Sequence, residues 1–199
     1  MKRWIRLTAG LLAVMLLFSA CVLEGQCEAV RRGVVRVHIL AHSDSEEDQR
    51  LKEAVRDAVI KAGAGLLDGV TDTEVAKERL TTALPHLQGV AEECVRENGY
   101  TYPVTATLTR MYFATRVYDA GTFPAGLYDA VRIVIGEGKG HNWWCVMYPP
   151  LCVAAATDKR TLADTVGQGG AALVGGRYRL AFKAVEWWES LCRFFAPNG

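Results

Sequence analysis

The chain has 199 residues, 50% of them hydrophobic, so its composition is that of a folding chain and excludes an intrinsically disordered one. The formal net charge is +1, and residues 1–24 contribute +2 of it, which leaves −1 on the rest. A near-neutral body lacks the basic surface that binds nucleic acid or anionic lipid. We therefore expect no nucleic-acid partner and no membrane contact outside the N-terminal segment.

The N-terminus has the three-part pattern of a secretory signal. Three basic side chains fall within the first six residues, an apolar run covers residues 7–20, and small residues precede Cys21. The apolar run is short for a membrane span, so the pattern predicts export. Three outcomes stay open: lipoprotein processing at Ala20-Cys21, cleavage near Gly25 or Ala29, and an uncleaved anchor from Trp4 to Leu23.

Residues 1–29 are accordingly assigned to a signal peptide or N-terminal anchor with a linker, and residues 30–199 to one domain. Hydrophobic periodicity predicts its elements in chain order. They are a strand over 34–41, a helix opened by a capping box from Ser43 to Glu46, a second helix from Thr71 to Leu84, a third from Pro85 to Asn98-Gly99, two strands or one bent strand over 102–118, a turn at 123–126, a strand over 127–135, a glycine-rich turn over 136–142, a strand over 143–148 and a helix over 180–195.

Helices and strands are segregated along this order, which is typical of an α+β domain. We predict a single domain with a mainly antiparallel sheet, three helices after the first strand and one C-terminal helix. In the first strand Val35, Val37 and Ile39 share one face, and Arg36 and His38 share the other.

The glycine-rich turn is not a phosphate loop. Lys139 is followed by Gly140 instead of Ser or Thr, and a strand comes next instead of a helix. His38 and His42 have the spacing of a helical zinc pair, but at a strand end this spacing separates them by about 13 Å. We therefore predict no metal site and no cofactor.

No nucleophile can be placed either. Cys145 has His141 nearby in sequence, but no third residue that would orient the pair. The acidic run over 44–48 lies at a predicted helix start, where carboxylates favour the positive end of the helix dipole. The prediction is that the protein has no catalytic residue and is not an enzyme.

The strand over 143–148 carries the clearest physical indication of a binding surface. Trp143 and Trp144 must face opposite sides of the sheet, so one of them needs another cover or stays exposed as an interaction anchor. Cys145 and Cys152 bracket Pro149-Pro150, and a bend there brings the two thiols close. A disulfide between them and a pair of buried free thiols are both open.

Several segments, in order, resemble one family. They are Val35–Ala41 with Ser43–Gln49, Leu51-Lys52 and Val55–Val59; Tyr102–Val104 with Tyr112-Phe113 and Thr115–Tyr118; Pro124–Gly138; Asn142–Cys152; and Phe182–Trp187. Together they are similar to the stage II sporulation protein R family of endospore-forming bacteria. Two departures are His42, where Asn is expected, and the glycine-rich stretch over 167–176, which has no counterpart.

The resemblance implies a role as a signal. Family members are made in the forespore and secreted into the intermembrane space, where they trigger a membrane-embedded aspartic protease of the mother cell that processes the sigma-E precursor. On this basis we expect Asn142, Trp143, Trp144, Pro149 and Pro150 to contact that protease. The alternative functions are an exported cell-wall hydrolase and a structural surface protein.

Overall fold

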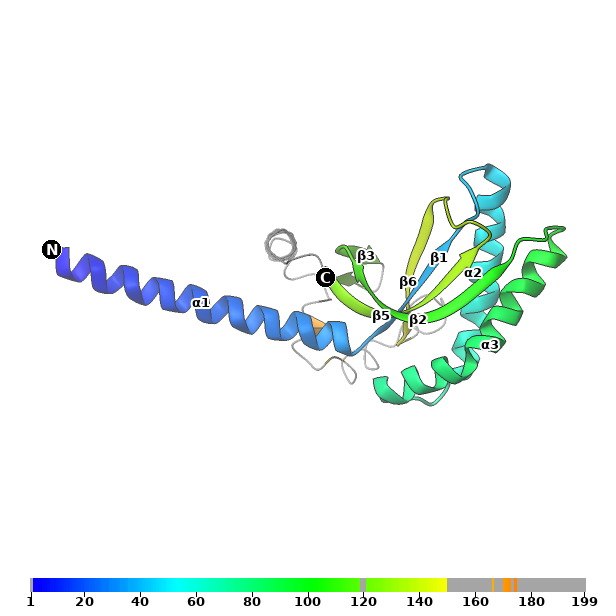
Figure 1. The fold of residues 1–199 in the computed structure, drawn as a ribbon. Coiled ribbons are helices and arrows are strands. Elements are labelled where there is room, and N and C mark those ends of the chain that lie inside the picture. The colour runs from blue at the N-terminus through cyan, green and yellow to red at the C-terminus, as the bar shows by residue number, and fades with distance from the viewer. Residues whose placement is uncertain (1, 119–120, 150–165, 167–169, 173, 175–199) are drawn as a thin grey trace.

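The computed structural model describes residues 2–118, 121–149, 166, 170–172 and 174. Their elements are α1 (Lys2–Arg32), β1 (Val35–Leu40), α2 (Glu46–Leu66), α3 (Thr73–Glu97), β2 (Val104–Phe113), β3 (Arg116–Tyr118), β4 (Gly121–Phe123), β5 (Gly126–Ile135) and β6 (Asn142–Tyr148). Figure 1 shows α2 and α3 lying together along one side of the strands, while α1 extends away from the body. The predicted α+β class is confirmed.

Four strands form one sheet in the order β2-β5-β1-β6. β1 runs parallel to β5, whereas the β2–β5 and β1–β6 pairs are antiparallel, so the predicted mainly antiparallel sheet is confirmed. The segment over 102–118 forms two strands, and the second of them, β3, pairs with β4 in a separate hairpin. Sequence periodicity does not predict β4, because three residues are too few to show a period.

The prediction of three helices after the first strand is wrong, since the second and third are one continuous helix, α3, with Pro85 in its interior. Leu80, Leu87 and Ala91 are buried on both sides of the proline, and Pro85 itself is exposed. Packing of this apolar stripe on the sheet outweighs the helix-breaking tendency of proline. The predicted C-terminal helix over 180–195 lies outside the described residues.

The helix ends differ from the prediction in one place. α2 begins at Glu46 and its N-cap is Ser45, whose hydroxyl accepts a hydrogen bond from the Asp48 amide, so the predicted capping box is shifted by two residues. α3 has Asp72 as its N-cap and Asn98 as its C-cap, followed by Gly99 at φ +84°, which agrees with the expected start and end.

Two hydrophobic clusters lie on opposite faces of the sheet. Val35, Val37 and Ile39 belong to the cluster that packs under α2 and α3, as their alternation predicts. The opposite cluster joins the end of α1 to the sheet and the β3–β4 hairpin, and includes Phe113 and Tyr128. Arg36 and His38 lie on this second face and are both buried.

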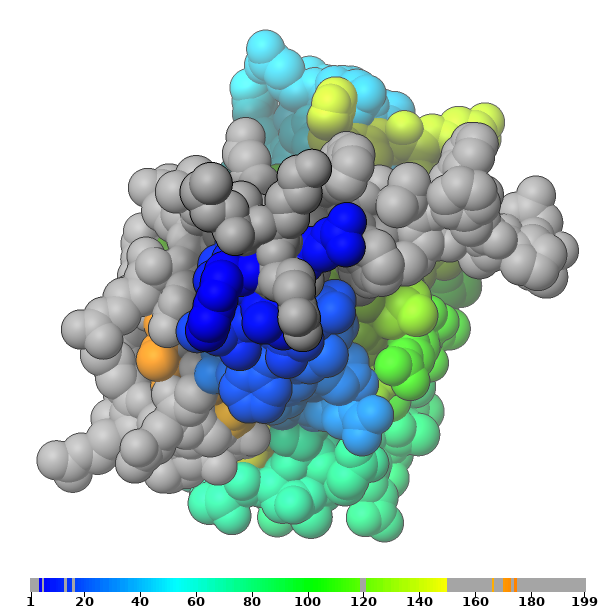
Figure 2. All heavy atoms as spheres, turned by 90° about the vertical axis from the view of Figure 1, so that its left-hand side faces the viewer, coloured from blue at the N-terminus to red at the C-terminus, as the bar shows by residue number. Residues whose placement is uncertain are grey.

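One helix within the described part of the chain, at residues 6–32, is long and apolar enough to cross a membrane, a property that it shares with signal sequences. Its described large apolar side chains up to Val22 are largely exposed to solvent. Figure 2 views the molecule from the side on which α1 starts, so that the helix stands in front of the body. These features agree with a signal peptide or an N-terminal anchor.

Candidate interaction surface

The two neighbouring tryptophans of β6 point to opposite sides of the sheet. Trp143 packs against the cluster under the helices, and its ring lies 5.4 Å from the guanidinium carbon of Arg56. Trp144 packs against the second cluster, and its indole Nε1 donates a hydrogen bond of 3.0 Å to Oδ1 of Asn142. Asn142 and Trp144 therefore share one face, and Trp143 does not belong to it.

Part of the sheet face that carries Trp144 is left open by the elements that the structure describes. Strand register places side chains of four strands next to one another there, and all of them are exposed or half-buried. We call this surface the open sheet face; it consists of Leu40, Thr105, Thr107, Arg132, Val134, Asn142 and Trp144.

Trp144 is held firmly within the open sheet face. Its ring stacks on His38 with centroids 3.8 Å apart and an angle of 9° between the planes. The edge of Phe113 meets the same ring at 4.7 Å, and the guanidinium of Arg116 lies 5.9 Å from its centre. A rigid, half-buried aromatic side chain of this kind loses little entropy when a partner covers it.

His38 provides a neutral support for this tryptophan. Burial and, to a smaller extent, the nearby charge of Arg132 together lower the pKa of His38 to about 4. Neither ring nitrogen has a hydrogen-bond partner among the described residues, which agrees with an uncharged ring buried between aromatic neighbours. The imidazole is therefore a packing group at neutral pH, and nothing in its surroundings prepares it for proton transfer.

Next along β1, Arg36 lies fully buried among aromatic rings. Its guanidinium carbon is 4.1 Å from the centre of the Phe113 ring and 4.9 Å from that of Tyr128, and Nη2 donates to the Tyr118 hydroxyl at 2.5 Å. Within the described part of the chain Nε and Nη1 have no hydrogen-bond partner, and burial lowers the pKa of the group. Through these contacts Arg36 joins the β3–β4 hairpin to the sheet, beside the open sheet face.

The two sides of the body differ in charge. On the face that carries Trp144, half-buried Arg132 and, beside the ring, exposed Arg116 carry positive charge, and no Asp or Glu stands on this face among the strand positions that the structure describes. On the other side, α2 and α3 together carry ten acidic and seven basic side chains, a formal charge of −3. The open sheet face therefore favours a partner surface that is acidic.

Of the other predicted contact residues, only Pro149 lies within the described part of the chain, and it does not join this surface. Pro149 is buried, after a cis peptide bond with Tyr148, and Pro150 lies outside the described residues. Cys145 is disulfide-bonded. Cys152 lies outside the described residues as well, so the Cys145–Cys152 pairing stays a prediction.

Sequence reasoning missed Arg132, Arg116 and Thr107 as members of this region. A usable signal was present, because β5 alternates and Arg132 interrupts its apolar residues on the side opposite Val131 and Ile133. The alternation does not show that Arg132 lies on the same face as Trp144, with His38 between them. That arrangement depends on the strand order, in which β1 lies between β5 and β6.

The glycine-rich turn after β5 is a structural loop, as predicted. Gly136 and Gly138 have φ values of +59° and +63°, which favour glycine. The Glu137 amide donates to Nδ1 of His42 at 3.0 Å, and the His141 amide donates to Oδ1 of Asp44 at 2.5 Å. These hydrogen bonds fasten the loop to the segment before α2. The hydrogen bond from the His141 amide also holds the pKa of Asp44 below its usual range.

The cluster at the end of β1 does not resemble a hydrolase site. His141 Nδ1 lies 2.5 Å from Asp44 Oδ1, but both side chains are mostly exposed, at 80% and 55%. The Ser43 hydroxyl donates to Asp48, whose own amide is bonded to the N-cap. The acidic residues thus close the loop and the helix end, and within the described residues no three His, Cys, Asp or Glu side chains group as a metal site would need.

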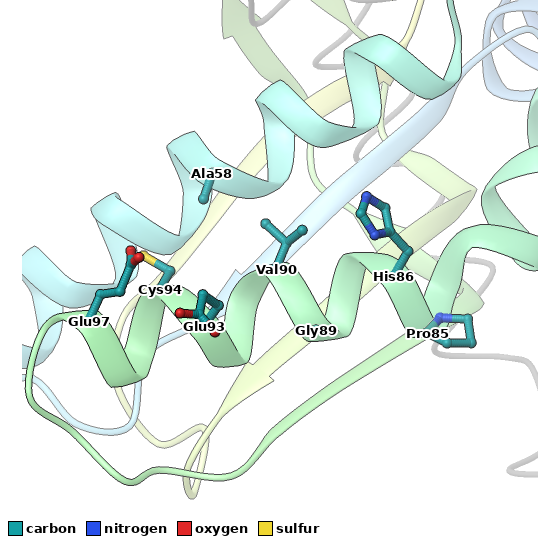
Figure 3. A pocket seen from close by; sticks show the side chains of 8 residues that line it. All are labelled: Ala58, Pro85, His86, Gly89, Val90, Glu93, Cys94 and Glu97. Carbon is teal, nitrogen blue, oxygen red and sulfur yellow. The ribbon is translucent and has the colours of Figure 1, made fainter.

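A groove of about 570 Å³ runs between α2 and α3, and Figure 3 shows Ala58, His86 and Val90 pointing into it, with Glu93 and Glu97 further along α3. His86 and Glu93 are seven residues apart, about 10 Å along the helix axis, too far for a proton relay. Burial, and then Glu97 and Asp57, raise the pKa of Cys94, which makes its thiol a poor nucleophile. His86, Glu93 and Cys94 therefore do not together form an acid–base or nucleophilic site in this groove.

Comparison with known proteins finds one matching family and a relative within it. The family model described as Stage II sporulation protein R matches residues 31–158. A stage II sporulation protein R of Bacillus subtilis (strain 168) is 36% identical over 129 residues, which are 65% of this chain and 58% of that protein. The chain thus spans less than two thirds of the length of this relative. No solved structure matches this chain.

Proposed function

We propose that this chain, which belongs to the stage II sporulation protein R family, is a secreted signal that activates the membrane-embedded aspartic protease processing the sigma-E precursor. On this proposal it leaves the forespore, acts in the intermembrane space and performs no catalysis itself. Membership of a sporulation family is established; export from the forespore, the protease partner and the non-enzymatic action are the proposal.

The observation that carries the proposal is where the family match lies on the fold. The match begins at Arg31, the penultimate residue of α1, and covers the whole described sheet and both helices that pack on it. The exposed apolar part of α1 precedes it, which is the place of an export signal. A shared folded body behind an export segment is what a secreted contact signal requires.

The open sheet face is our candidate for the contact with the protease. Trp144 is the strongest anchor on it, because it is aromatic, half-buried and held in one orientation by His38 and Phe113. The adjoining arginines direct the proposal toward an acidic part of the extracytoplasmic surface of the protease.

The test is complementation of a strain that lacks the gene, scored for conversion of the sigma-E precursor. Trp144→Ala should reduce conversion at least tenfold, the loss of about 1.4 kcal/mol or more at a central aromatic contact. Trp143→Ala is the matched control on the opposite face and should leave conversion near the wild-type level. Secreted amounts are compared by immunoblot.

Because Trp144 also packs against His38, a second variant separates binding from folding. Thr107→Glu changes an exposed side chain of β2 and places a negative charge beside Arg132. We expect it to lower conversion without lowering secretion. Normal conversion with both Trp144→Ala and Thr107→Glu, at normal secretion, would remove the open sheet face from the proposal.

Export is tested separately by removing residues 1–20. The shortened protein should be made at normal levels and stay in the forespore, with no conversion of the precursor. Full conversion by this non-exported form would contradict a secreted signal, and hydrolysis of cell wall by the purified exported protein would favour the hydrolase alternative.

A further inference from the structure

The last third of α1 is part of the folded body. Cys27 and Val30 are fully buried in the cluster on the second sheet face, and Leu23 packs against the same cluster. In contrast, the large apolar side chains that the structure describes from Trp4 to Val22, nine in all, are 45–74% exposed. One continuous helix is thus divided near residue 22 into an undocked part and a docked part.

Arg31 fastens the docked part to the sheet. It is buried, its Nε donates to the carbonyl oxygen of Ala125 at 2.9 Å, and its Nη1 donates to Oε1 of Glu24 at 2.6 Å. The backbone of Gly126 makes room for this side chain, because a Cβ built there would collide with Arg31. The link from Glu24 through Arg31 to the start of β5 spans two helical turns and ends on the sheet.

This division bears on where an export leader can be removed. A cut near Gly25 would separate Glu24 from Arg31, and a cut near Ala29 would also remove Cys27 from the buried cluster. Signal peptidases need small residues one and three positions before the cut. In the undocked part that leads up to Leu23, Ser19 and Cys21 supply such a pair directly after the apolar run.

We propose that the export leader is cut next to Cys21 and that residues 22–32 remain as the first helix of the mature domain. This inference rests on the proposed export of the chain. It gives α1 two roles: the segment before Cys21 targets the chain, and the segment after it closes the second core of the sheet. Of the sites considered from sequence alone, Gly25 and Ala29 are rejected because they lie within the docked part.

The experiment uses the full chain, expressed in an endospore-forming host and recovered in its exported form. Intact mass and N-terminal sequencing should give Val22 as the first residue, because Ser19 and Cys21 then stand three and one positions before the cut. Any other first residue, or an exported chain of full mass, would overturn the proposal.

Two substitutions test the same boundary by a different readout. Ser19→Phe should block processing, so that the full-length precursor becomes the main form. Ala29→Leu is the matched control: Ala29 is exposed, so the domain tolerates it, and processing should stay complete. Normal processing of Ser19→Phe together with a block in Ala29→Leu would overturn the assignment.

Docking of the helix is tested on the purified exported protein. Arg31→Met should lower its melting temperature by about 4 °C or more, since the carbonyl of Ala125 loses its donor, whereas Arg32→Met, at an exposed position, should shift it by less than about 1 °C. Equal melting temperatures for the two variants would overturn the docked role. None of these readouts depends on sigma-E processing, so the inference can fail independently of the proposed function.

Discussion

At the scale of single residues, the second face of β1 is unusual because it buries two polar side chains. His38 and Arg36 are polar side chains placed among aromatic rings, and neither has a carboxylate partner among the described residues. Burial opposes the charged form of each, and it lowers the pKa of His38 to about 4. The cost of burying these groups is offset by stacking and cation–π contacts, which fix Trp144 and the hairpin in place.

The pKa of His38 predicts how stability depends on pH. The unfolded chain takes up a proton near pH 6.5 and the folded one only near 4, so the unfolded state binds more protons between these values. The free energy of unfolding should therefore fall by roughly 1–2 kcal/mol from pH 7 to pH 5 through this residue. Urea denaturation at both pH values measures it.

The control for this pH effect is His38→Phe, which keeps an aromatic ring against Trp144 and cannot titrate. The free energy of unfolding of the variant should change less between pH 7 and pH 5 than that of the wild type. The same pH dependence in both proteins would show that His38 is not the responsible group.

A second residue-scale prediction concerns Cys145, which is disulfide-bonded. Peptide mapping without reduction should recover it linked to Cys152; a link to Cys192 would contradict the predicted pairing. A reductant should lower the free energy of unfolding of the wild type by about 2 kcal/mol, as expected for closing a short loop. It should do the same in Cys94→Ala, and have no such effect in Cys145→Ser.

At the scale of elements, α3 is the helix for which the sequence pattern predicts the wrong boundaries. Pro85 marks a helix start in the local pattern, yet α3 passes through it for 25 residues. The helix gives up one backbone hydrogen bond there, since proline has no N–H. Its apolar stripe on the sheet compensates for this loss, and α3 is therefore a helix with a local defect that tertiary packing tolerates.

Pro85→Ala should restore that hydrogen bond and raise the free energy of unfolding by roughly 1–3 kcal/mol, less than the full helix penalty because proline also restricts the unfolded chain. Gly89→Ala is a matched substitution one turn further on, where an added Cβ meets nothing within 4 Å. It should add about 0.5–1 kcal/mol. Denaturant midpoints measure both, and destabilisation by Pro85→Ala would favour the two separate helices that the sequence predicts.

At the scale of the whole molecule, charge is distributed by side. The helix layer carries a formal charge of −3, while the open sheet face has Arg132, with exposed Arg116 beside it, and no acidic strand residue among the described positions. The described parts of the two sides therefore differ in the sign of their charge. Such polarity orients a partner more than it strengthens binding.

Reversal of charge on one side tests this polarity. Arg132→Glu on the open sheet face should reduce conversion of the sigma-E precursor several-fold, since it repels the acidic partner surface that we propose. Glu93→Lys reverses a charge on the exposed side of α3 and should leave conversion near normal. Equal effects of the two variants, at equal secretion, would contradict a one-sided contact.

Much of this protein follows from its sequence alone. The family blocks, the apolar N-terminal segment, the α+β class and the two faces of β1 are all local or ordered patterns, and such patterns survive in the sequence because each depends on neighbouring residues. The opposite orientation of Trp143 and Trp144 follows in the same way, from the two-residue period of a strand.

Only the tertiary structure decided the rest. Residues far apart in sequence had to meet before Trp144 could stack on His38, before Arg31 could reach the carbonyl of Ala125, and before α3 could continue through Pro85. Each of these depends on which element covers which face of the sheet. That choice is set by the strand order β2-β5-β1-β6 and by the burial of apolar surface across long sequence separations, which no local periodicity encodes.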